Sequence, residues 1–181
     1  MYRFILIVLL AGILFDFSFA QSARKINREG NEFYKNGEYE KAARNYEKAF
    51  AQNKNLIEAS YNLALSYYRQ EKYNEAITQS KKTLSRTSDK ELLSKLYHNL
   101  GNSYLKVNKL KESIDSYQNS LRINPGDKET RYNLTYAMLK YKASQKEQNT
   151  KDLLDRIEQE EKFSQQFRRR NRNRGKEVKN W

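Results

Sequence analysis

Residues 30–42 read GNEFYKNGEYEKA, and this pattern of small and aromatic residues returns twice along the chain. Residues 64–76 read ALSYYRQEKYNEA and residues 101–113 read GNSYLKVNKLKES, while Thr135 opens a fourth, partial copy. The copies begin at positions 30, 64, 101 and 135, so the steps between them are 34, 37 and 34 residues. A period near 34 residues is typical of stacked helix-turn-helix repeats. No stretch alternates apolar and polar residues as a half-buried strand does. The sequence therefore predicts an all-α repeat array.

Each copy predicts where two helices cross and where the chain turns. Gly30, Ala64 and Gly101 lie inside a helical pattern, where glycine costs about 1 kcal/mol relative to alanine. Small residues in that place indicate a close crossing with the second helix of the pair. Gly37 marks the turn of the first copy, and Tyr39 begins its second helix.

Two short stretches frame the third copy. The three additional residues between the second and third copies fall near residues 88–90 and predict a lengthened turn. Residues 124–127 read NPGD, in which proline and glycine end one helix and Asp127 is suited to cap the next. The sequence thus predicts a further helix beginning directly after Asp127.

The repeated residues resemble the tetratricopeptide repeat (TPR) family over roughly residues 22–142. The resemblance implies an α-solenoid of three TPR helix pairs at about residues 23–56, 57–90 and 94–127, with a capping helix over residues 128–142. Four small polar residues, Ser80, Thr83, Ser113 and Ser120, replace the usual aromatic residue or alanine and predict looser packing. The matching residues are Gly30, Phe33, Tyr39, Ala42, Tyr46 and Ala49; Ala59, Leu63, Ala64, Tyr67, Tyr73 and Ala76; and Tyr97, Leu100, Gly101, Tyr104, Tyr117 and Pro125.

The first twenty residues have the layout of a secretory signal peptide. Arg3 precedes an unbroken apolar run over residues 4–15, and Ser18 and Ala20 place small residues before Gln21. An uncleaved N-terminal membrane anchor is the alternative, although a spanning helix needs about 20 apolar residues. We therefore expect a periplasmic or secreted protein, associated with the inner membrane if the segment is an anchor.

The C-terminal part of the chain separates into three stretches of different composition. Residues 143–150 read ASQKEQNT and predict a polar linker. Residues 151–167 predict an amphipathic helix, with Leu153, Ile157, Phe163 and Phe167 on one side. Residues 168–181 form a basic tail, which contributes to the net charge of +13.

Several interpretations of this C-terminal part remain open. It is a solvated charged end, a helix that packs back on the repeats, or a docking element for a partner protein or an anionic membrane. Nucleic acid, which basic runs bind through phosphates, fits poorly with an export signal. The docking candidates are Phe163, Phe167, Arg168, Arg169, Arg170, Arg172, Arg174 and Trp181.

The TPR resemblance implies that the first helix of each pair lines a concave groove. Tyrosine and asparagine side chains there suit an extended peptide backbone, and the lysines and arginines favour an acidic or mixed peptide. The predicted groove residues are Arg24, Asn27, Asn31, Tyr34, Lys35, Tyr61, Asn62, Leu65, Tyr68, Arg69, Lys95, His98, Asn99, Asn102, Lys106, Tyr132, Asn133 and Tyr136.

One group of TPR domains holds a C-terminal carboxylate with two asparagines, two lysines and an arginine. Asn31, Asn62 and Lys95 match three of these five positions. Asn27 and Asn99 stand where that group has a lysine and an arginine. The groove is therefore expected to lack two of the charges that such a clamp uses.

The chain also resembles BatC, the TPR protein of the bacterial aerotolerance operon. That group combines a signal sequence, about three repeats and a charged tail, and residues 130–134, 153–162 and 179–181 match it here. The resemblance implies membrane-anchored partner proteins that carry von Willebrand A domains.

The residue types available argue against an enzyme. The chain has a single histidine, His98, and no cysteine, so a histidine-rich metal site and a thiol nucleophile are excluded. No cofactor, metal or small-molecule substrate is expected. The sequence predicts a non-catalytic scaffold of the cell envelope, part of an aerotolerance-type complex, that binds proteins in its groove. The alternative is a membrane- or partner-docking module driven by the C-terminal tail.

Overall fold

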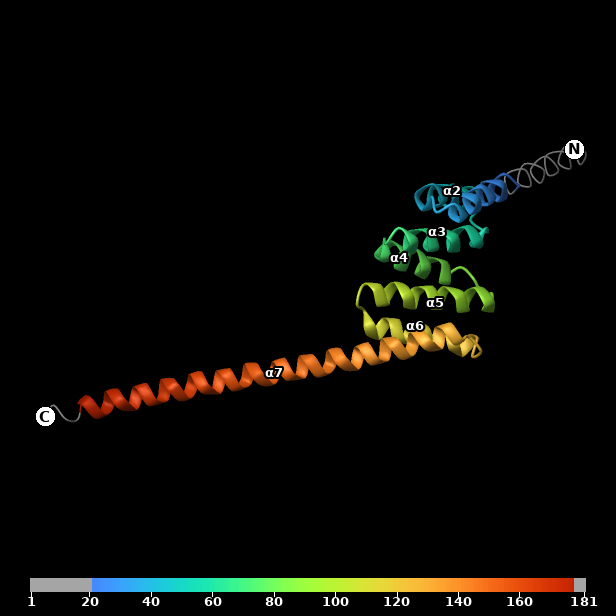
Figure 1. Cartoon of the computed structure of the whole chain (residues 1–181). Helices are drawn as coiled ribbons and strands as arrows, with labels where there is room; N and C mark the ends of the chain where they lie inside the picture. The colour runs from blue at the N-terminus through green and yellow to red at the C-terminus, as the bar shows by residue number, and fades with distance from the viewer. Residues whose placement is uncertain (1–20, 178–181) are drawn as a thin grey trace, which may run out of the picture. The chain divides into compact units, whose positions relative to one another are not determined.

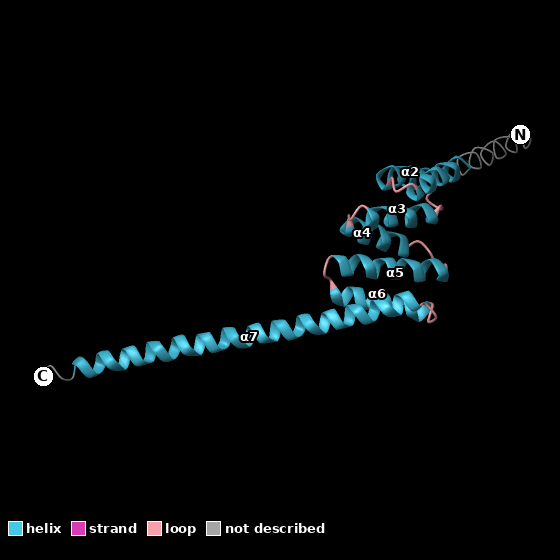
Figure 2. Cartoon of the chain, in the orientation of Figure 1, coloured by secondary structure: helices cyan, strands magenta, loops and turns pink. Residues whose placement is uncertain are grey.

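The computed structural model describes residues 21–177, without the side chains of residues 171–177. The predicted signal peptide over residues 1–20 lies outside the described residues. The first described helix covers residues 21–35. It is followed by α2 (Tyr39–Gln52), α3 (Ile57–Arg69), α4 (Tyr73–Leu84), α5 (Lys90–Lys106), α6 (Leu110–Ile123) and α7 (Lys128–Glu177). Figure 2 shows helices and short loops and no strand over residues 21–177, which confirms the all-α prediction.

The chain divides into two compact units, Met1–Met138 and Leu139–Trp181. In the first unit each helix from α2 to α5 packs against the next one along the chain, and α3 also contacts α5 (Figure 1). This order gives three helix pairs, in which the first helices of successive pairs are neighbours. The predicted array of helix pairs is confirmed.

The small residues lie where helices cross, as the sequence predicts. A Cβ atom added to Gly30 would lie 2.8 Å from the Tyr46 ring, and one added to Gly101 would lie 2.5 Å from the Tyr117 ring. Both distances are too short for real atoms, so only glycine fits beneath a tyrosine at this crossing. The second pair has Ala64 in the equivalent place, and its second helix carries the small Ser80 instead of tyrosine. The replacement of glycine by Ala64 thus accompanies the replacement of tyrosine by Ser80.

Three of the four polar replacements in the repeats, Thr83, Ser113 and Ser120, are buried and hydrogen-bonded, which differs from the looser packing expected there. The hydroxyl groups of Ser60 and Thr83 lie 2.7 Å apart between α3 and α4. The hydroxyl of Ser120 donates to the carbonyl oxygen of Ser94, at 2.9 Å, between α5 and α6. Because each hydroxyl has a partner, its burial carries little penalty.

The turns inside the three pairs share one backbone conformation. Gly37, Glu71 and Asn108 occupy equivalent positions and all have positive φ, at 77°, 61° and 58°. The following N–H group donates back to a carbonyl oxygen five residues earlier at 2.9 Å in all three turns, as in Glu38 to Phe33. This is the Schellman helix end, which glycine and asparagine favour. The turn predicted at Gly37 is confirmed.

The three additional residues before the third copy lengthen a helix, which corrects the prediction of a longer turn. The first helix of the second pair, α3, has 13 residues, whereas α5 has 17. The difference lies at the start of α5, where the Asp89 side chain accepts a hydrogen bond from the Leu92 N–H at 3.1 Å. This N-cap stabilises a helix start one turn earlier than in α3.

The second unit, residues 139–181, is helical to Glu177 as the continuation of α7. The linker predicted over residues 143–150 is wrong as a break in structure, since these residues are helical. Their alanine, glutamine, lysine and glutamate residues are good helix formers and include no glycine or proline. Side-chain pairs one turn apart, such as Glu158–Lys162 at 2.6 Å, support the exposed helix. Over residues 21–177, no helix combines the length and the apolar character that a bilayer crossing requires.

Candidate functional site

The first helices of the repeats form a row that is crossed by hydrogen bonds between asparagine side chains. The Asn62 amide donates to Asn31 Oδ1 at 3.2 Å, which joins α3 to the helix over residues 21–35. The Asn133 amide donates to Asn102 Oδ1, also at 3.2 Å, which joins the start of α7 to α5. The Asn99 amide donates to the Tyr61 hydroxyl at 3.1 Å, which joins α5 to α3. We call Asn31, Asn62, Asn99, Asn102 and Asn133 the amide row.

Two buried tyrosines from the second helices fix the ends of the amide row. The Tyr46 hydroxyl donates to Asn31 Oδ1 at 2.8 Å, and the Tyr117 hydroxyl donates to Asn102 Oδ1 at 2.6 Å. Burial raises the pKa of both phenols above the usual value, so both remain proton donors at neutral pH. Each asparagine oxygen therefore accepts two hydrogen bonds, and its side chain is held in one orientation.

The middle repeat departs from this scheme in a consistent way. Leu65 occupies the position of Asn31 and Asn102, and Ser80 occupies the position of the two tyrosines. Because leucine accepts no hydrogen bond, Asn99 pairs with Tyr61 instead. The amide row thus continues through the middle repeat with a tyrosine hydroxyl in place of an amide oxygen.

His98 lies within a hydrogen-bonded chain and not at a free position. Its Nδ1 lies 2.6 Å from the Thr130 hydroxyl, which itself lies 2.6 Å from Asp127 Oδ2. Its Nε2 lies 3.0 Å from the Asn102 amide nitrogen and 3.5 Å from a Glu129 carboxylate oxygen. If the Thr130 hydroxyl donates to the carboxylate, His98 Nδ1 donates to Thr130 and Nε2 accepts from Asn102. The ring therefore joins α5 to the start of α7.

Asp127 caps α7, as the sequence predicts. Its Oδ1 accepts a hydrogen bond from the Thr130 N–H at 3.0 Å. Burial opposes ionisation of this carboxyl group, but the hydrogen bonds from the hydroxyl and N–H of Thr130 outweigh it and lower the pKa of Asp127. The carboxylate is thus ionised at neutral pH and stabilises the start of the helix.

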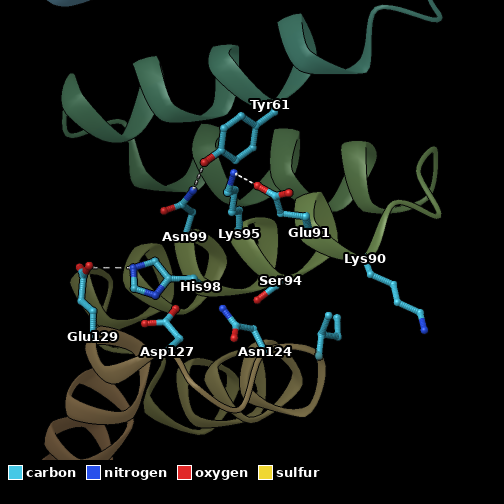
Figure 3. Close-up of a pocket in the computed structure, with 11 residues that line it drawn as sticks. Tyr61, Lys90, Glu91, Ser94, Lys95, His98, Asn99, Asn124, Asp127 and Glu129 are labelled. Atoms are coloured by element: carbon cyan, nitrogen blue, oxygen red, sulfur yellow. Dashed lines mark hydrogen bonds and ion pairs between the residues drawn. The ribbon is translucent and has the colours of Figure 1, made fainter.

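A pocket of about 570 Å³ opens beside the amide row in the third repeat (Figure 3). Tyr61 from α3 lies on one side of it, and Asp127 and Asn124 from the α6–α7 connection lie on the opposite side. The additional first turn of α5 contributes Lys90 and Glu91. The lining residues are Tyr61, Lys90, Glu91, Ser94, Lys95, His98, Asn99, Ile123, Asn124, Asp127 and Glu129.

The cations of the predicted groove differ in how they are held. Lys95 pairs with Glu91 at 2.5 Å, and this hydrogen bond raises the pKa of Lys95. Lys35 pairs with Glu32 at 3.0 Å. Arg69 Nε donates to the Tyr34 hydroxyl at 3.2 Å. Arg24 and Lys106 are exposed.

Asn27, predicted to line the groove, is buried between two helices. It is 4% exposed, and its amide lies 3.4 Å from a Glu58 carboxylate oxygen. A TPR carboxylate clamp has a lysine in this place, so Asn27 and Glu58 together leave this end of the row without that positive charge. Asn99 likewise replaces an arginine, and its amide is occupied by Tyr61.

The remaining predicted positions lie on the same first helices or on the second unit. Tyr34 and Tyr68 make edge contacts with Tyr39 and Tyr73, with ring centroids 5.2 and 5.4 Å apart. Leu65 is half-buried, whereas Tyr132 and Tyr136 at the start of α7 are exposed. In the second unit Phe163, Phe167, Arg168, Arg169 and Arg170 are exposed, and Arg172 and Arg174 are helical. Trp181 lies outside the described residues.

Sequence reasoning did not place Tyr46, Tyr117 or Thr130 at the site. The signal for the tyrosines was present, because each follows a glycine by 16 residues and an asparagine by 15. In the second repeat the glycine, the asparagine and the tyrosine are all replaced, by Ala64, Leu65 and Ser80. Thr130 carries no comparable signal, since its role depends on how α7 packs against α5.

Comparisons with known proteins agree with this architecture. Residues 30–71 match the family model described as TPR repeat, and residues 55–125 match the one described as Tetratricopeptide repeat. Heat shock protein STI1 of Saccharomyces cerevisiae is 31% identical over 105 residues, which cover 55% of this chain and 17% of that protein. Protein STIP1 homolog of Dictyostelium discoideum is 35% identical over 96 residues, which cover 51% of this chain and 17% of that protein.

Solved structures show the same fold. The TPR2AB domain of yeast Sti1, in a complex with pHSP90, superposes with a TM-score of 0.64 at 29% identity, covering 70% of this chain and 50% of that one. The first TPR domain of human RPAP3 gives a TM-score of 0.65 at 20% identity, covering 70% and 98%. The chain therefore carries tetratricopeptide repeats in a TPR solenoid, an architecture for protein–protein interaction. It spans about a sixth of the length of the curated relatives that it matches.

Proposed function

We propose that this protein is a non-catalytic scaffold whose amide row binds an extended segment of a partner protein. The amide row supports this proposal most directly. Asn62, Asn99 and Asn133 each donate one side-chain N–H along the row. Their carbonyl oxygens accept no hydrogen bond from a protein group within residues 21–177, which leaves them able to accept peptide N–H groups.

The charges beside the amide row favour an acidic or mixed segment over a free C-terminus. Arg24, Lys35, Arg69 and Lys106 lie on the first helices, but Asn27 and Asn99 replace two clamp cations. Glu58 adds a carboxylate beside Asn27. Because binding of a terminal carboxylate needs concentrated positive charge, we propose that the amide row binds an internal segment of the partner protein. The likeness to the Sti1 domain solved with pHSP90 supports peptide binding in general.

The cellular setting belongs to the same proposal. The apolar run over residues 4–15, with Arg3 before it, supports export to the cell envelope. The resemblance to BatC supports membrane-anchored proteins with von Willebrand A domains as the partners. Fractionation of the full chain, with N-terminal sequencing of the recovered protein, tests the export. Recovery of the unprocessed chain in the cytoplasm would contradict it.

Charge reversal beside the amide row tests the groove. Arg69→Glu with Lys95→Glu should reduce the partner protein captured from solubilised envelope by about tenfold, because both cations would become repulsive to an acidic segment. Lys48→Glu with Lys82→Glu is the matched control, since both lysines are exposed on second helices. Equal capture by the two double variants would show that the binding site lies outside the amide row.

A truncation separates this proposal from docking driven by the tail. A chain ending before residue 149 keeps the amide row and lacks the amphipathic and basic stretches. It should retain the captured partner if the row binds it. Complete loss of the partner would favour the tail as the working part.

A further inference from the structure

In the second unit, α7 presents a stripe of large apolar side chains to solvent. Leu153, Ile157, Phe163 and Phe167 are 55%, 51%, 71% and 58% exposed. With about 3.6 residues per turn, these four positions fall within an arc of about 120° on one side of the helix. A helix that carries such a stripe is stabilised when another surface covers it.

The spacing within the stripe is symmetric about Glu160. The four residues follow one another at intervals of 4, 6 and 4 positions, from Leu153 through Ile157 and Phe163 to Phe167. This order of intervals is the same in both directions along the helix. A second copy running antiparallel, with a two-fold axis at residue 160, would place Leu153 against Phe167 of the second copy. It would equally place Ile157 against Phe163 of that copy. A two-fold interface requires this self-complementarity.

The charges around the stripe change sign at its centre. In residues 150–158 the three acidic residues Asp152, Asp155 and Glu158 outnumber Lys151 and Arg156, whereas residues 162–170 contain Lys162 and three arginines and no acidic residue. An antiparallel pair brings the acidic half of one helix alongside the basic half of the other. A parallel pair in register would place like charges together.

One charge pair can be placed more closely. Asp152 and Arg170 are 18 residues apart, which corresponds to five helical turns, so both lie on the same flank of the stripe. In a two-fold antiparallel pair the same flanks of the two helices meet. Asp152 would then lie within about two residues, or about 3 Å along the axis, of Arg170 in the second copy, which a long arginine side chain spans.

From the stripe, its symmetry and its charges, we propose that a second copy of this chain covers it. The interface is an antiparallel helix pair centred on Glu160. It lies in a different unit from the amide row and does not depend on the proposed peptide binding.

Glu160 makes a lipid surface the weaker candidate for the same stripe. It lies in the middle of the apolar arc. A carboxylate there is repelled by anionic headgroups. Between two copies the paired Glu160 side chains also repel each other, which keeps the association weak and concentration-dependent. Neutralising Glu160 should therefore tighten it.

Sedimentation equilibrium of the full chain tests the association, from about 1 µM to about 1 mM, where weak interfaces form. The mean mass should rise from monomer to dimer. Ile157→Gln should weaken the dimer by about tenfold or more, as for a central apolar contact. Leu154→Gln is the matched control, because Leu154 is also exposed, at 60%, but lies to the side of the stripe. Circular dichroism should show unchanged helix content in both variants.

Glu160→Gln gives a result of opposite sign. It should strengthen the dimer several-fold, since it removes the repulsion at the axis. Glu147→Gln, which removes a carboxylate away from the stripe, should leave the association unchanged. Equal effects of the two substitutions would contradict an axis at residue 160.

Single cysteines define the direction of the pair, because the chain has no cysteine of its own. On mild oxidation, Glu160→Cys should form a covalent dimer readily, since the axis brings two copies of this position together. Leu153→Cys should form little dimer alone, but should link to Phe167→Cys when the two are mixed.

Two outcomes would overturn the proposal. One is self-linking of Leu153→Cys as fast as Glu160→Cys, which indicates a parallel pair. The other is a monomer at every concentration, together with binding to phosphatidylcholine–phosphatidylglycerol vesicles that Ile157→Gln abolishes. That combination assigns the stripe to a lipid surface.

Discussion

At the scale of single residues, three positions in each repeat vary together. In the first and third repeats a glycine is followed directly by an asparagine, and a tyrosine lies 15 residues after that asparagine. The tyrosine ring packs on the glycine, and its hydroxyl donates to the asparagine. Gly101 leaves room for the Tyr117 ring, and the Tyr117 hydroxyl orients Asn102. The second repeat has Ala64, Leu65 and Ser80 in these places. Packing and the amide row therefore depend on the same residues.

Gly101→Ala should destabilise the first unit by about 2 kcal/mol, a typical cost of overpacking. The added methyl group would lie 2.5 Å from a Tyr117 ring that is fully buried and has no space to move. Thermal unfolding should shift downward by about 5–8 °C. Gly126→Ala is the control, because its nearest neighbour would be an Asn124 oxygen at 3.6 Å.

The same substitution should have the opposite sign once the tyrosine is removed. In a Tyr117→Ser background, which reproduces the Ala64–Ser80 combination, Gly101→Ala should be neutral or stabilise by up to about 1 kcal/mol through helix propensity. A double-mutant cycle measures the difference. Equal destabilisation in both backgrounds would show that the ring is not the cause.

Asp127 should make stability depend on pH in the acidic range. Its pKa is lower in the folded protein than in the unfolded chain, so its contribution is fully present above the unfolded value of about 3.9. The contribution is lost as the pH falls through the folded value. Asp127→Ala should cost about 1 kcal/mol at neutral pH, as for a lost helix cap. Urea unfolding at successive pH values should show the gap between the two proteins closing below about pH 4. A gap that stays constant would contradict an ionised cap.

At the scale of elements, helix boundaries decide what each repeat presents. The cap at Asp89 starts α5 a turn earlier than α3, which adds Lys90 and Glu91 to the pocket wall. The Asp127 cap starts α7, which brings Thr130 and Asn133 to α5. The pocket and the hydrogen bond from Asn133 to Asn102 thus depend on where α5 and α7 begin.

The continuous helix across residues 143–150 can be tested with proline. Lys146→Pro removes a helical hydrogen bond and should reduce the circular dichroism signal at 222 nm. The thermal transition of the repeats should remain within about 2 °C, because residue 146 belongs to the second unit. Gln118→Pro, at an exposed position of α6, should instead unfold the repeats. Unchanged helix content in Lys146→Pro would mean that these residues form a linker, as composition alone predicts.

At the scale of the whole molecule, the two units have different sources of stability. Residues up to 138 bury apolar side chains such as Tyr46, Leu96 and Tyr117 between helices. Residues 139–170 are almost entirely exposed. The repeats therefore fold on packing, whereas the later part of α7 relies on helix propensity, local side-chain pairs and, in our proposal, a second copy.

Truncation after Met138 should leave the repeats folded. Because the buried core lies before this residue, the truncated chain should unfold cooperatively within about 3 °C of the full chain. It should also remain monomeric at concentrations where the full chain associates. A non-cooperative transition would show that the second unit supports the repeats.

The sequence alone determined the repeat period, the all-α fold and the turn at Gly37. These features follow from local patterns, because small residues, aromatic residues and turn residues recur at fixed intervals. Tertiary structure decided that Asn27 is buried and that the amides of successive repeats pair. These outcomes depend on contacts between residues about 31 to 38 positions apart. A local pattern cannot fix such contacts, since they exist only once neighbouring helices have packed.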